Sequence, residues 1–182
     1  MEAAHALADA GLAPQRNFFV VLDELWRVLR AGRGLVDRVD ALTRLNRQRG
    51  LGQAMITHTM ADMLALPDPA DQMKAKGFAE RAGMVICGGL PQAEMATLTE
   101  VVRLPRAEQS MVVDWSTPPS WDGKLNRDGE PPGRGKFLVK VGGRPGIPFR
   151  VDLSPSERAV NDTNKRWSHS TTRTTGATGT PV

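Results

Sequence analysis

Continuous apolar runs alternate along the chain with stretches in which apolar residues recur every three or four positions. The apolar run from Phe18 to Leu22 leads directly into Asp23 and Glu24. A continuous run of this kind predicts a strand that is buried on both faces, as in a parallel sheet. Ligands of open α/β sheets bind at the carboxyl ends of the strands. Asp23 and Glu24 therefore lie where the chemistry of such a domain is expected.

The rest of the pattern alternates short strands with helices. Further strands are predicted at residues 54–58, 84–87 and 111–113, and a hairpin at 136–141 and 147–153. Helices are predicted at residues 2–10, from 25 to the glycine turn at 32–34, and at 35–49, 59–66, 68–82, 91–102 and 154–167. A Pro- and Gly-rich surface loop is expected at 116–135. This order predicts one α/β domain over residues 1–167, followed by a disordered Ser/Thr-rich tail at 168–182.

Three of the predicted helices begin with a recognisable cap. Thr59 is an expected N-cap, and Asp68 is expected to cap a helix with proline at its first position. Ser154 and Glu157 have the spacing of a capping box.

Composition narrows the classes of function. The 182 residues are 40% hydrophobic, enough for a globular core, and the net charge is +4 with a pI near 9.7. This mild basicity is compatible with a nucleic-acid or anionic partner without requiring one. The single cysteine, Cys87, excludes an internal disulfide and a zinc site built on cysteines. Its apolar neighbours predict a buried, inert thiol.

Asp23 and Glu24 allow two interpretations. Mg²⁺ prefers hard oxygen ligands and hydrolysis needs a base, so adjacent carboxylates at a strand end suit both tasks. They equally suit the start of a helix, where the helix dipole favours acidic side chains. The downstream sequence has to decide between the two.

The predicted helix at 35–49 ends in a cationic run that contains Arg44, Arg47 and Arg49. These side chains either form a solvated face, on which Asp40 pairs with Arg44, or reach phosphate groups across a subunit interface. The sequence does not rank the three arginines.

Residues 129–137 look like a phosphate-binding loop because they end in Gly-Lys followed by Phe137. The spacing between the glycines is one residue too long, and Phe137 stands where Ser or Thr is needed. The segment also precedes a strand, whereas a phosphate loop follows a strand and opens a helix. A turn is predicted instead, and the pattern G-x-x-x-x-G-K-[ST] does not occur in the sequence.

Six short motifs follow one another in a characteristic order. They are VLDELW at 21–26, LTRLNR at 42–47, THT at 57–59, GGLP at 88–91, GRGKFL at 133–138 and NDTNKRW at 161–167. The set resembles the C-terminal part of HerA/FtsK-class P-loop ATPases, and more narrowly the conjugative, type IV secretion-type ATPases of actinobacteria. The region that carries it, residues 21–167, is about four fifths of the chain.

The resemblance implies a RecA-like fold, the use of ATP with Mg²⁺, and a ring that usually has six subunits. Asp23 matches the Walker B carboxylate that holds Mg²⁺, and Glu24 matches the residue that activates the attacking water. His58 ends the strand that matches the sensor strand, where the wider superfamily usually carries Gln. It is either a hydrogen-bond donor to a γ-phosphate or water, or an ordinary, partly buried histidine.

Arginines are implied as contacts to the nucleotide at a ring interface. Arg134 and Arg144, in the C-terminal segment, are candidates for this role by resemblance. Arg44 and Arg47 join them as cofactor-binding candidates from the cationic helix. The implied cofactors are therefore ATP and Mg²⁺, at a site that this sequence carries only in part.

The departure from the family is the missing Walker A strand, loop and helix, which we expect upstream of Met1. The expected fold is a RecA-like partial parallel sheet with flanking helices, plus a C-terminal β-hairpin and helix. In the sheet that the chain resembles, the Walker A strand lies between the strand that ends at His58 and the strand at 84–87. Without it those two strands have unpaired inner edges, unless they pair with each other. The isolated chain is then expected to be inactive and only marginally stable.

The implied function is that of a C-terminal fragment of an ATP-hydrolysing motor of conjugative transfer or type IV secretion, active only with a Walker A-bearing half. One alternative is a non-catalytic assembly subunit that has kept the surface and lost turnover. Another is a fragment of a DNA-translocating ATPase, indicated by the basic charge and the clustered arginines. The implied partners are copies of the chain in a ring, the secretion or conjugation machinery and, for the last alternative, DNA.

No signal peptide is visible, and no apolar stretch approaches the ~20 residues that a membrane-spanning helix needs. The expected location is therefore the cytoplasm, with a peripheral position at the inner face of the membrane left open.

Overall fold

The structure is a computed structural model that describes residues 2–14, 16–45, 50–122, 127–128 and 131–160. It divides into two units, Met1–Phe149 and Arg150–Val182, which are described separately. The predicted tail at 168–182 and the end of the last predicted helix, at 161–167, lie outside the described residues.

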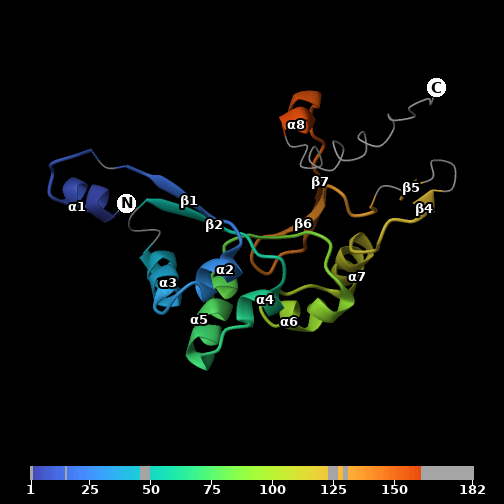
Figure 1. Cartoon of the computed structure of the whole chain (residues 1–182), viewed down its shortest axis with the longest axis horizontal. Coiled ribbons are helices and arrows are strands. Elements are labelled where there is room, and N and C mark those ends of the chain that lie inside the picture. The colour runs from blue at the N-terminus through green and yellow to red at the C-terminus, as the bar shows by residue number, and fades with distance from the viewer. Residues whose placement is uncertain (1, 15, 46–49, 123–126, 129–130, 161–182) are drawn as a thin grey trace, which may run out of the picture. The chain divides into compact units, whose positions relative to one another are not determined.

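Helices and strands alternate along the chain (Figure 1). The helices are α1 (Glu2–Asp9), α2 (Leu25–Arg30), α3 (Leu35–Leu45), α4 (Met60–Leu64), α5 (Pro69–Glu80), the 3₁₀ helix η1 (Gln92–Glu94), α6 (Met95–Thr99), α7 (Arg106–Trp115) and α8 (Pro155–Val160). The strands are β1 (Phe18–Leu22), β2 (Leu51–Met55), β3 (Val85–Cys87), β4 (Trp121–Asp122), β5 (Arg127–Asp128), β6 (Lys136–Lys140) and β7 (Ile147–Arg150). The predicted α/β class is confirmed.

Strands β1 and β2 form a parallel pair, with Phe18 opposite Leu51 and Leu22 opposite Met55. The segment between them contains α2 and α3, because parallel neighbours need a long crossover connection. The prediction of a strand at 54–58 was wrong at both ends, because β2 runs from Leu51 to Met55 and His58 lies in the segment that follows it. Gly52 lies inside this strand. A Cβ at this position would lie 2.6 Å from Cδ2 of Phe19, so a larger residue would have to displace the Phe19 ring.

The prediction that β1 is buried on both faces is also wrong. Side chains along β1 alternate between half-buried and exposed, and Phe19 and Val21 are 71% and 54% exposed. Leu22 instead packs against the hydrophobic core. Within the described residues the helices cover one face of β1 only, although parallel strands usually have both faces covered.

One hydrophobic core connects the helices to the second sheet. Its centre contains Leu25, Val112 and Leu138, the three largest fully buried side chains, from α2, α7 and β6. The other buried core residues are Leu29, Val36, Val39, Met60, Met63, Leu66, Ala75, Phe78, Cys87, Met95, Leu98, Val102 and Leu104. They come from the α-helices α2 to α6, from β3 and from loops between them, so these elements, α7 and β6 form one packed body.

The second sheet has the strand order β3-β6-β7, and β3 runs antiparallel to β6. Strand β3 and the predicted hairpin of β6 and β7 are confirmed, with strands slightly shorter than expected. Cys87 and Leu138 are buried on one face, while Ile86 and Ile147 are 55% and 66% exposed. Stacking of the Phe137 and Phe149 rings, 5.6 Å apart, adds to the apolar surface.

Strands β2 and β3 do not pair with each other within the described residues. The only described partner of β2 is β1, and β3 is an edge strand whose described partner is β6. The gap expected between them is therefore not closed by direct pairing.

The predicted fourth strand at 111–113 is wrong, because these residues lie inside α7. Three apolar residues are too few to distinguish a strand from a helix. Val112 is completely buried, and its carbonyl accepts a hydrogen bond from the Leu90 amide at 3.2 Å. Tertiary packing thus selects the helix.

The segment at 116–135, predicted to be a loop, contains a small antiparallel ladder. Trp121 pairs with Asp128 and Asp122 with Arg127. The described part of the expected turn at 129–137 is confirmed by the Lys136 amide, which donates to the Gly133 carbonyl at 3.0 Å.

The predicted caps are confirmed by their hydrogen bonds. The Thr59 hydroxyl accepts from the Asp62 amide at 2.9 Å, and the Asp68 carboxylate accepts from the Ala70 amide at 2.8 Å. In the C-terminal unit the Ser154 amide donates to the Glu157 carboxylate at 2.8 Å, which forms one half of the capping box.

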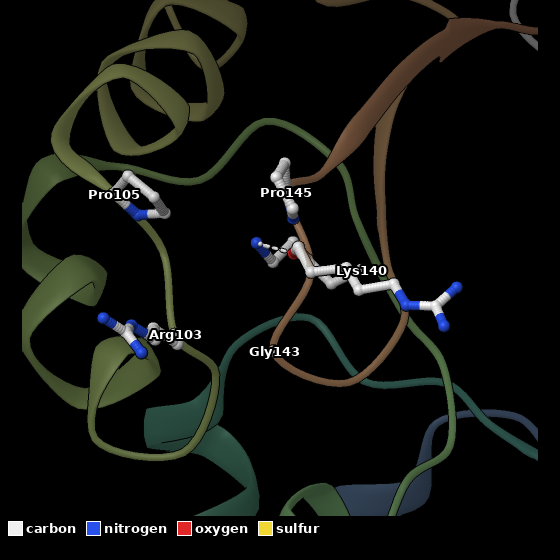
Figure 2. A pocket seen from close by; sticks show the side chains of 6 residues that line it. Arg103, Pro105, Lys140, Gly143 and Pro145 are labelled. Carbon is white, nitrogen blue, oxygen red and sulfur yellow. Dashed lines mark hydrogen bonds between the residues drawn. The ribbon is translucent and has the colours of Figure 1, made fainter.

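A buried ion pair fixes the β6–β7 turn on α7. Lys140 is only 3% exposed, and its ammonium donates to Glu108 Oε2 at 2.8 Å. It also donates to the Arg144 carbonyl at 2.8 Å, the bond drawn in Figure 2. Glu108 Oε1 accepts from the Gly146 amide at 2.7 Å. Burial alone would raise the pKa of Glu108, but the bonds from Lys140 and Gly146 outweigh it and hold that pKa below its usual value.

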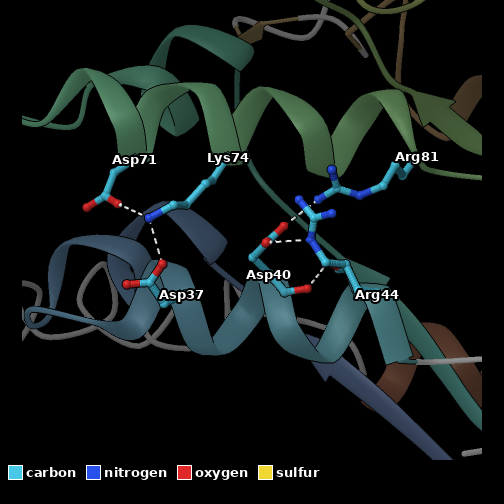
Figure 3. Close-up of polar contacts among 7 residues, drawn as sticks. Asp37, Asp40, Arg44, Asp71, Lys74 and Arg81 are labelled. Carbon is cyan, nitrogen blue, oxygen red and sulfur yellow. Dashed lines mark hydrogen bonds and ion pairs between the residues drawn. The ribbon is translucent and has the colours of Figure 1, made fainter.

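A second set of ion pairs joins α3 to α5 (Figure 3). Asp40 accepts from Arg44 at 2.7 Å and from Arg81 at 2.6 Å. Lys74 donates to Asp37 at 2.6 Å and to Asp71 at 3.1 Å, and these two carboxylates raise the pKa of Lys74. The pairs fix the register of two helices whose apolar faces contribute to the core.

We expect Glu108→Gln to lower the free energy of unfolding by about 3 kcal/mol, because it leaves the buried Lys140 charge unpaired. A carboxyl with a lowered pKa stabilises the fold fully above its unfolded pKa and loses this effect as the pH falls through its folded pKa. The difference between the parent chain and the variant should therefore shrink below about pH 4. Urea unfolding followed by circular dichroism measures both effects.

Glu100→Gln is the matched control, because Glu100 pairs with Lys76 at 2.9 Å and its side chain is 60% exposed. It should cost less than about 1 kcal/mol. Sucrose, which strengthens burial, can be added equally to all samples to keep a marginally stable chain folded. Equal losses in the two variants would contradict the structural role of the Lys140–Glu108 pair.

Candidate functional site

The carboxyl ends of β1 and β2 lie at the same edge, and backbone hydrogen bonds continue beyond them. The Ile56 amide donates to the Leu22 carbonyl at 2.9 Å, and the Leu25 amide donates to the Ile56 carbonyl at 2.8 Å. These two bonds fix the chain on either side of Asp23 and Glu24. They also bring the segment that contains His58 against the start of α2.

Glu24 and His58, predicted independently from two strand ends, contact each other. His58 Nε2 lies 3.1 Å from Glu24 Oε1, and the two side chains are 66% and 38% exposed. The other oxygen, Glu24 Oε2, accepts a hydrogen bond from Trp26 Nε1 at 2.5 Å. The Glu24 carboxylate is thus oriented from both sides while it stays open to solvent.

The backbone of Glu24 is left-handed, with φ 52° and ψ 48°, and among the described residues it is the one non-glycine residue with positive φ. Such a conformation costs about 1–2 kcal/mol for an L-residue. Strain of this kind persists where the surroundings hold it, and it gathers at functional sites. In this chain the backbone bonds of Leu22, Leu25 and Ile56 hold it.

Asp23 is exposed, and its Oδ1 accepts from the Glu24 amide at 3.0 Å. Within the described residues no group of three His, Cys, Asp or Glu side chains could hold a metal ion. One exposed carboxylate nevertheless fits Mg²⁺, which keeps several waters and takes its other ligands from the substrate phosphates. Asp23 therefore fits as a shared magnesium ligand and does not form a complete protein site.

The alternative interpretation, that Asp23 and Glu24 only start a helix, agrees with where α2 begins but not with the hydrogen bonds of Glu24. Helix α2 begins at Leu25, directly after the two acidic residues, and its N-cap position makes no side-chain hydrogen bond. The Glu24 carboxylate points to Trp26 and His58 instead. Capping therefore does not account for this side chain.

Trp26 is the site residue that the sequence interpretation did not assign. Besides bonding to Glu24, its ring lies under the guanidinium of Arg30, 5.2 Å from the ring centroid. Arg30 in turn donates to the Asp62 carbonyl at 3.1 Å, which ties α2 to α4. The sequence does show a tryptophan two residues after Glu24. That its indole N–H bonds to the Glu24 carboxylate could not be predicted, because this contact depends on the left-handed turn at Glu24.

The four candidate arginines are not brought to this site by any described contact. Arg44 is paired with Asp40, and its side chain is 62% exposed. Arg134 lies in the turn before β6, and Arg144 in the turn between β6 and β7. Arg47 lies outside the described residues. Their roles as phosphate contacts stay predictions.

Cys87 is 5% exposed, and burial raises the pKa of its thiol to about 11. This confirms the prediction of a buried thiol, which stays protonated and unreactive at neutral pH. In the part of the chain that the structure describes, no helix is long and apolar enough to cross a membrane.

The left-handed backbone at Glu24 leads to a test on stability. Both Glu24→Gly and Glu24→Ala remove the carboxylate, but only glycine adopts positive φ without strain. We expect the glycine variant to be about 1 kcal/mol more stable than the alanine variant. Thermal or urea unfolding of the two proteins measures the difference.

The same pair of substitutions at Arg38, an exposed position inside α3, provides the control. There alanine should be the more stable residue, by about 1 kcal/mol, because glycine weakens a helix. A lower stability of Glu24→Gly than of Glu24→Ala would show that the left-handed conformation is not needed.

Comparison with known proteins bears on the fold. No family model matches the chain, and no curated protein matches it in sequence. Among solved structures the chain is similar to VirB4 of Thermoanaerobacter pseudethanolicus, with a TM-score of 0.59 and 17% sequence identity. The match covers 86% of this chain and 36% of VirB4, so the chain spans about a third of the length of that protein. The fold of most of this chain therefore corresponds to one part of a larger protein's fold.

Proposed function

We propose that the chain is the C-terminal portion of an ATP-hydrolysing motor of type IV secretion or conjugative transfer. The observation that carries this proposal is the contact between Glu24 and His58 at the carboxyl edge of the parallel β1–β2 pair. This contact lies in a fold similar to part of VirB4, a protein of type IV secretion. The ordered sequence motifs support the same class of ATPase.

In this proposal Asp23 is the Walker B ligand of Mg²⁺ and Glu24 is the base that activates water. A bound Mg²⁺ would neutralise charge on the phosphates of ATP. Trp26 and His58 hold the two oxygens of the Glu24 carboxylate, so its direction is set before a substrate arrives. His58 is also the residue proposed to donate a hydrogen bond to a γ-phosphate or water.

The arginines are proposed to contact phosphates between subunits of a ring, usually of six. Arg44 would first have to leave Asp40, whereas Arg144 has no carboxylate partner within the described residues. Arg47 and Arg134 keep the same proposed role. The secretion or conjugation machinery is the proposed partner, and the inner face of the membrane the proposed location, on the cytoplasmic side.

The proposal requires a second half that brings the phosphate clamp. Two features of the fold support it: strands β2 and β3 are not paired with each other, and apolar side chains stand exposed on both sheets. Phe19 and Ile86 are 71% and 55% exposed. Apolar side chains exposed on a sheet face suit burial against a further layer of structure.

The non-catalytic alternative is an assembly subunit that has kept the surface and lost turnover. In that case the same surfaces would serve assembly, and ATP turnover would be absent even when the other half is supplied. Salt-dependent binding of DNA by the purified chain would favour the DNA-translocating alternative instead.

We expect the 182-residue chain alone to bind Mg-ATP weakly or not at all. Positioning and clamping of the phosphates are most of what such an ATPase contributes, and two carboxylates without a clamp repel a triphosphate. Isothermal titration calorimetry with Mg-ATP tests this. Binding in the micromolar range would mean that the phosphate clamp is contained in this chain.

The catalytic assignment is tested in a protein that carries a Walker A-bearing half, either fused before Met1 or co-expressed. Glu24→Gln should keep ATP binding and slow turnover by about 10²–10⁴-fold, because it keeps the shape and removes the base. Asp23→Ala should instead weaken Mg²⁺-dependent binding. Phosphate release and nucleotide binding are measured separately, and turnover of Glu24→Gln at the parent rate would exclude Glu24 as the base.

A further inference from the structure

A pocket of about 270 Å³ lies between the loop before α7 and the β6–β7 turn. It is lined by Arg103, Pro105, Lys140, Gly143, Arg144 and Pro145. Figure 2 shows Arg103 and Pro105 on one side, facing Lys140 and Pro145 on the other. The pocket shares no residue with the cluster of Asp23, Glu24 and His58.

The charge of the pocket is positive. Three cationic side chains line it, and the one carboxylate among their described contacts is Glu108. Glu108 is fully engaged, because one oxygen bonds to Lys140 and the other to the Gly146 amide. Within the described residues neither Arg103 nor Arg144 has an ion pair, in contrast to Arg44 and Arg81, which share Asp40.

Contacts of the neighbouring backbone hold the positions of both arginines in the chain before any ligand binds. Arg103 stands between Val102 and Leu104, which are 6% and 5% exposed, so its Cα is held in the core while its side chain is exposed. The Arg144 carbonyl is fixed by Lys140 at 2.8 Å. A pair of cations on anchored backbone loses less entropy on binding than two mobile surface residues.

The end of α7 adds to the positive potential. Pro105, which lines the pocket, is the N-cap residue of α7, so the positive end of the helix dipole faces the pocket. Helix α7 has 10 residues, which is long enough for such a dipole. Cations, helix dipole and pocket therefore all favour one class of ligand, an anion.

We propose that this pocket binds the di- or triphosphate group of a small ligand, with Arg103 and Arg144 as the phosphate contacts. Guanidinium groups match phosphate oxygens in a bidentate geometry. The volume suits a short phosphate chain and is slightly below the usual ~300–1000 Å³ of pockets that enclose a whole ligand. This site deepens the proposed role of Arg144 and adds Arg103 and Lys140, but it rests on the pocket and not on ATP turnover.

Inorganic pyrophosphate without Mg²⁺ is the probe, titrated into the purified chain by calorimetry and by amide NMR. We expect saturable binding that is weaker than micromolar, as fits a chain without the Walker A clamp, with shifts at Gly143, Arg144 and Gly146. Arg103→Gln and Arg144→Gln should each weaken binding about tenfold or more, because each removes a charged hydrogen-bond donor. Both side chains are exposed, so these variants should keep the fold.

Arg38→Gln is the matched control, because it removes the same charge from an exposed position on α3 outside the pocket. It should change the affinity less than twofold. An equal loss of affinity in all three variants would mean that pyrophosphate binding depends only on the net charge of the chain, which would contradict the proposal. Absence of binding at millimolar pyrophosphate, or binding of single-stranded DNA that pyrophosphate does not displace, would also overturn the proposal.

Glu108→Gln tests whether binding depends on the fixed geometry of the pocket or only on its positive charge. It makes the pocket more positive but weakens the contacts of Glu108 with Lys140 and with the Gly146 amide, and so loosens the turn that carries Arg144. A site that depends on the fixed turn should lose affinity in this variant, and simple charge attraction should gain affinity. Measured at a temperature at which circular dichroism confirms the fold, an increase would contradict the proposed pocket. Failure of ATP hydrolysis in the completed motor would leave this result unchanged.

Discussion

The parallel pairing of β1 with β2 is the constraint on which the candidate site depends. Its register places Leu22 opposite Met55, and the backbone bonds of Ile56 extend the pairing past both strands. A slip of one residue would turn every side chain of a strand to the other face. It would also separate Glu24 from His58, because neither residue is held near the other by local sequence. The chemistry of this edge is therefore set by backbone register rather than by side-chain attraction.

Local features of the fold could be read from the sequence, and non-local ones could not. The caps at Thr59 and Asp68 were predictable because their hydrogen bonds reach only two or three residues ahead. The helix over Met111 was not, because burial of Val112 against distant segments decided its state. Asp23 and Glu24 were visible as a strand end, whereas the N–H of Trp26 found Glu24 only through the left-handed turn.

The two sheets share an unusual distribution of apolar surface. In each, one face contributes to the common core and the other exposes aromatic or branched side chains, such as Phe19 on β1 and Ile147 on β7. The neighbour VirB4 is much longer than the matched region, since the match covers 36% of its chain. Uncovered strands of this composition are a hazard for a chain on its own, because they invite edge-to-edge association. They are ordinary interior surface once another layer is packed on them.

The buried thiol of Cys87 has a practical consequence for studying this chain. The protein has one cysteine, which is 5% exposed and whose pKa burial raises to about 11. The folded chain should therefore react only slowly with thiol-specific reagents. A cysteine introduced on the surface would accept a fluorophore or spin label selectively, without removal of the native residue. Conversely, labelling of Cys87 itself would report that the core between β3 and β6 has opened, which makes it an intrinsic gauge of local unfolding.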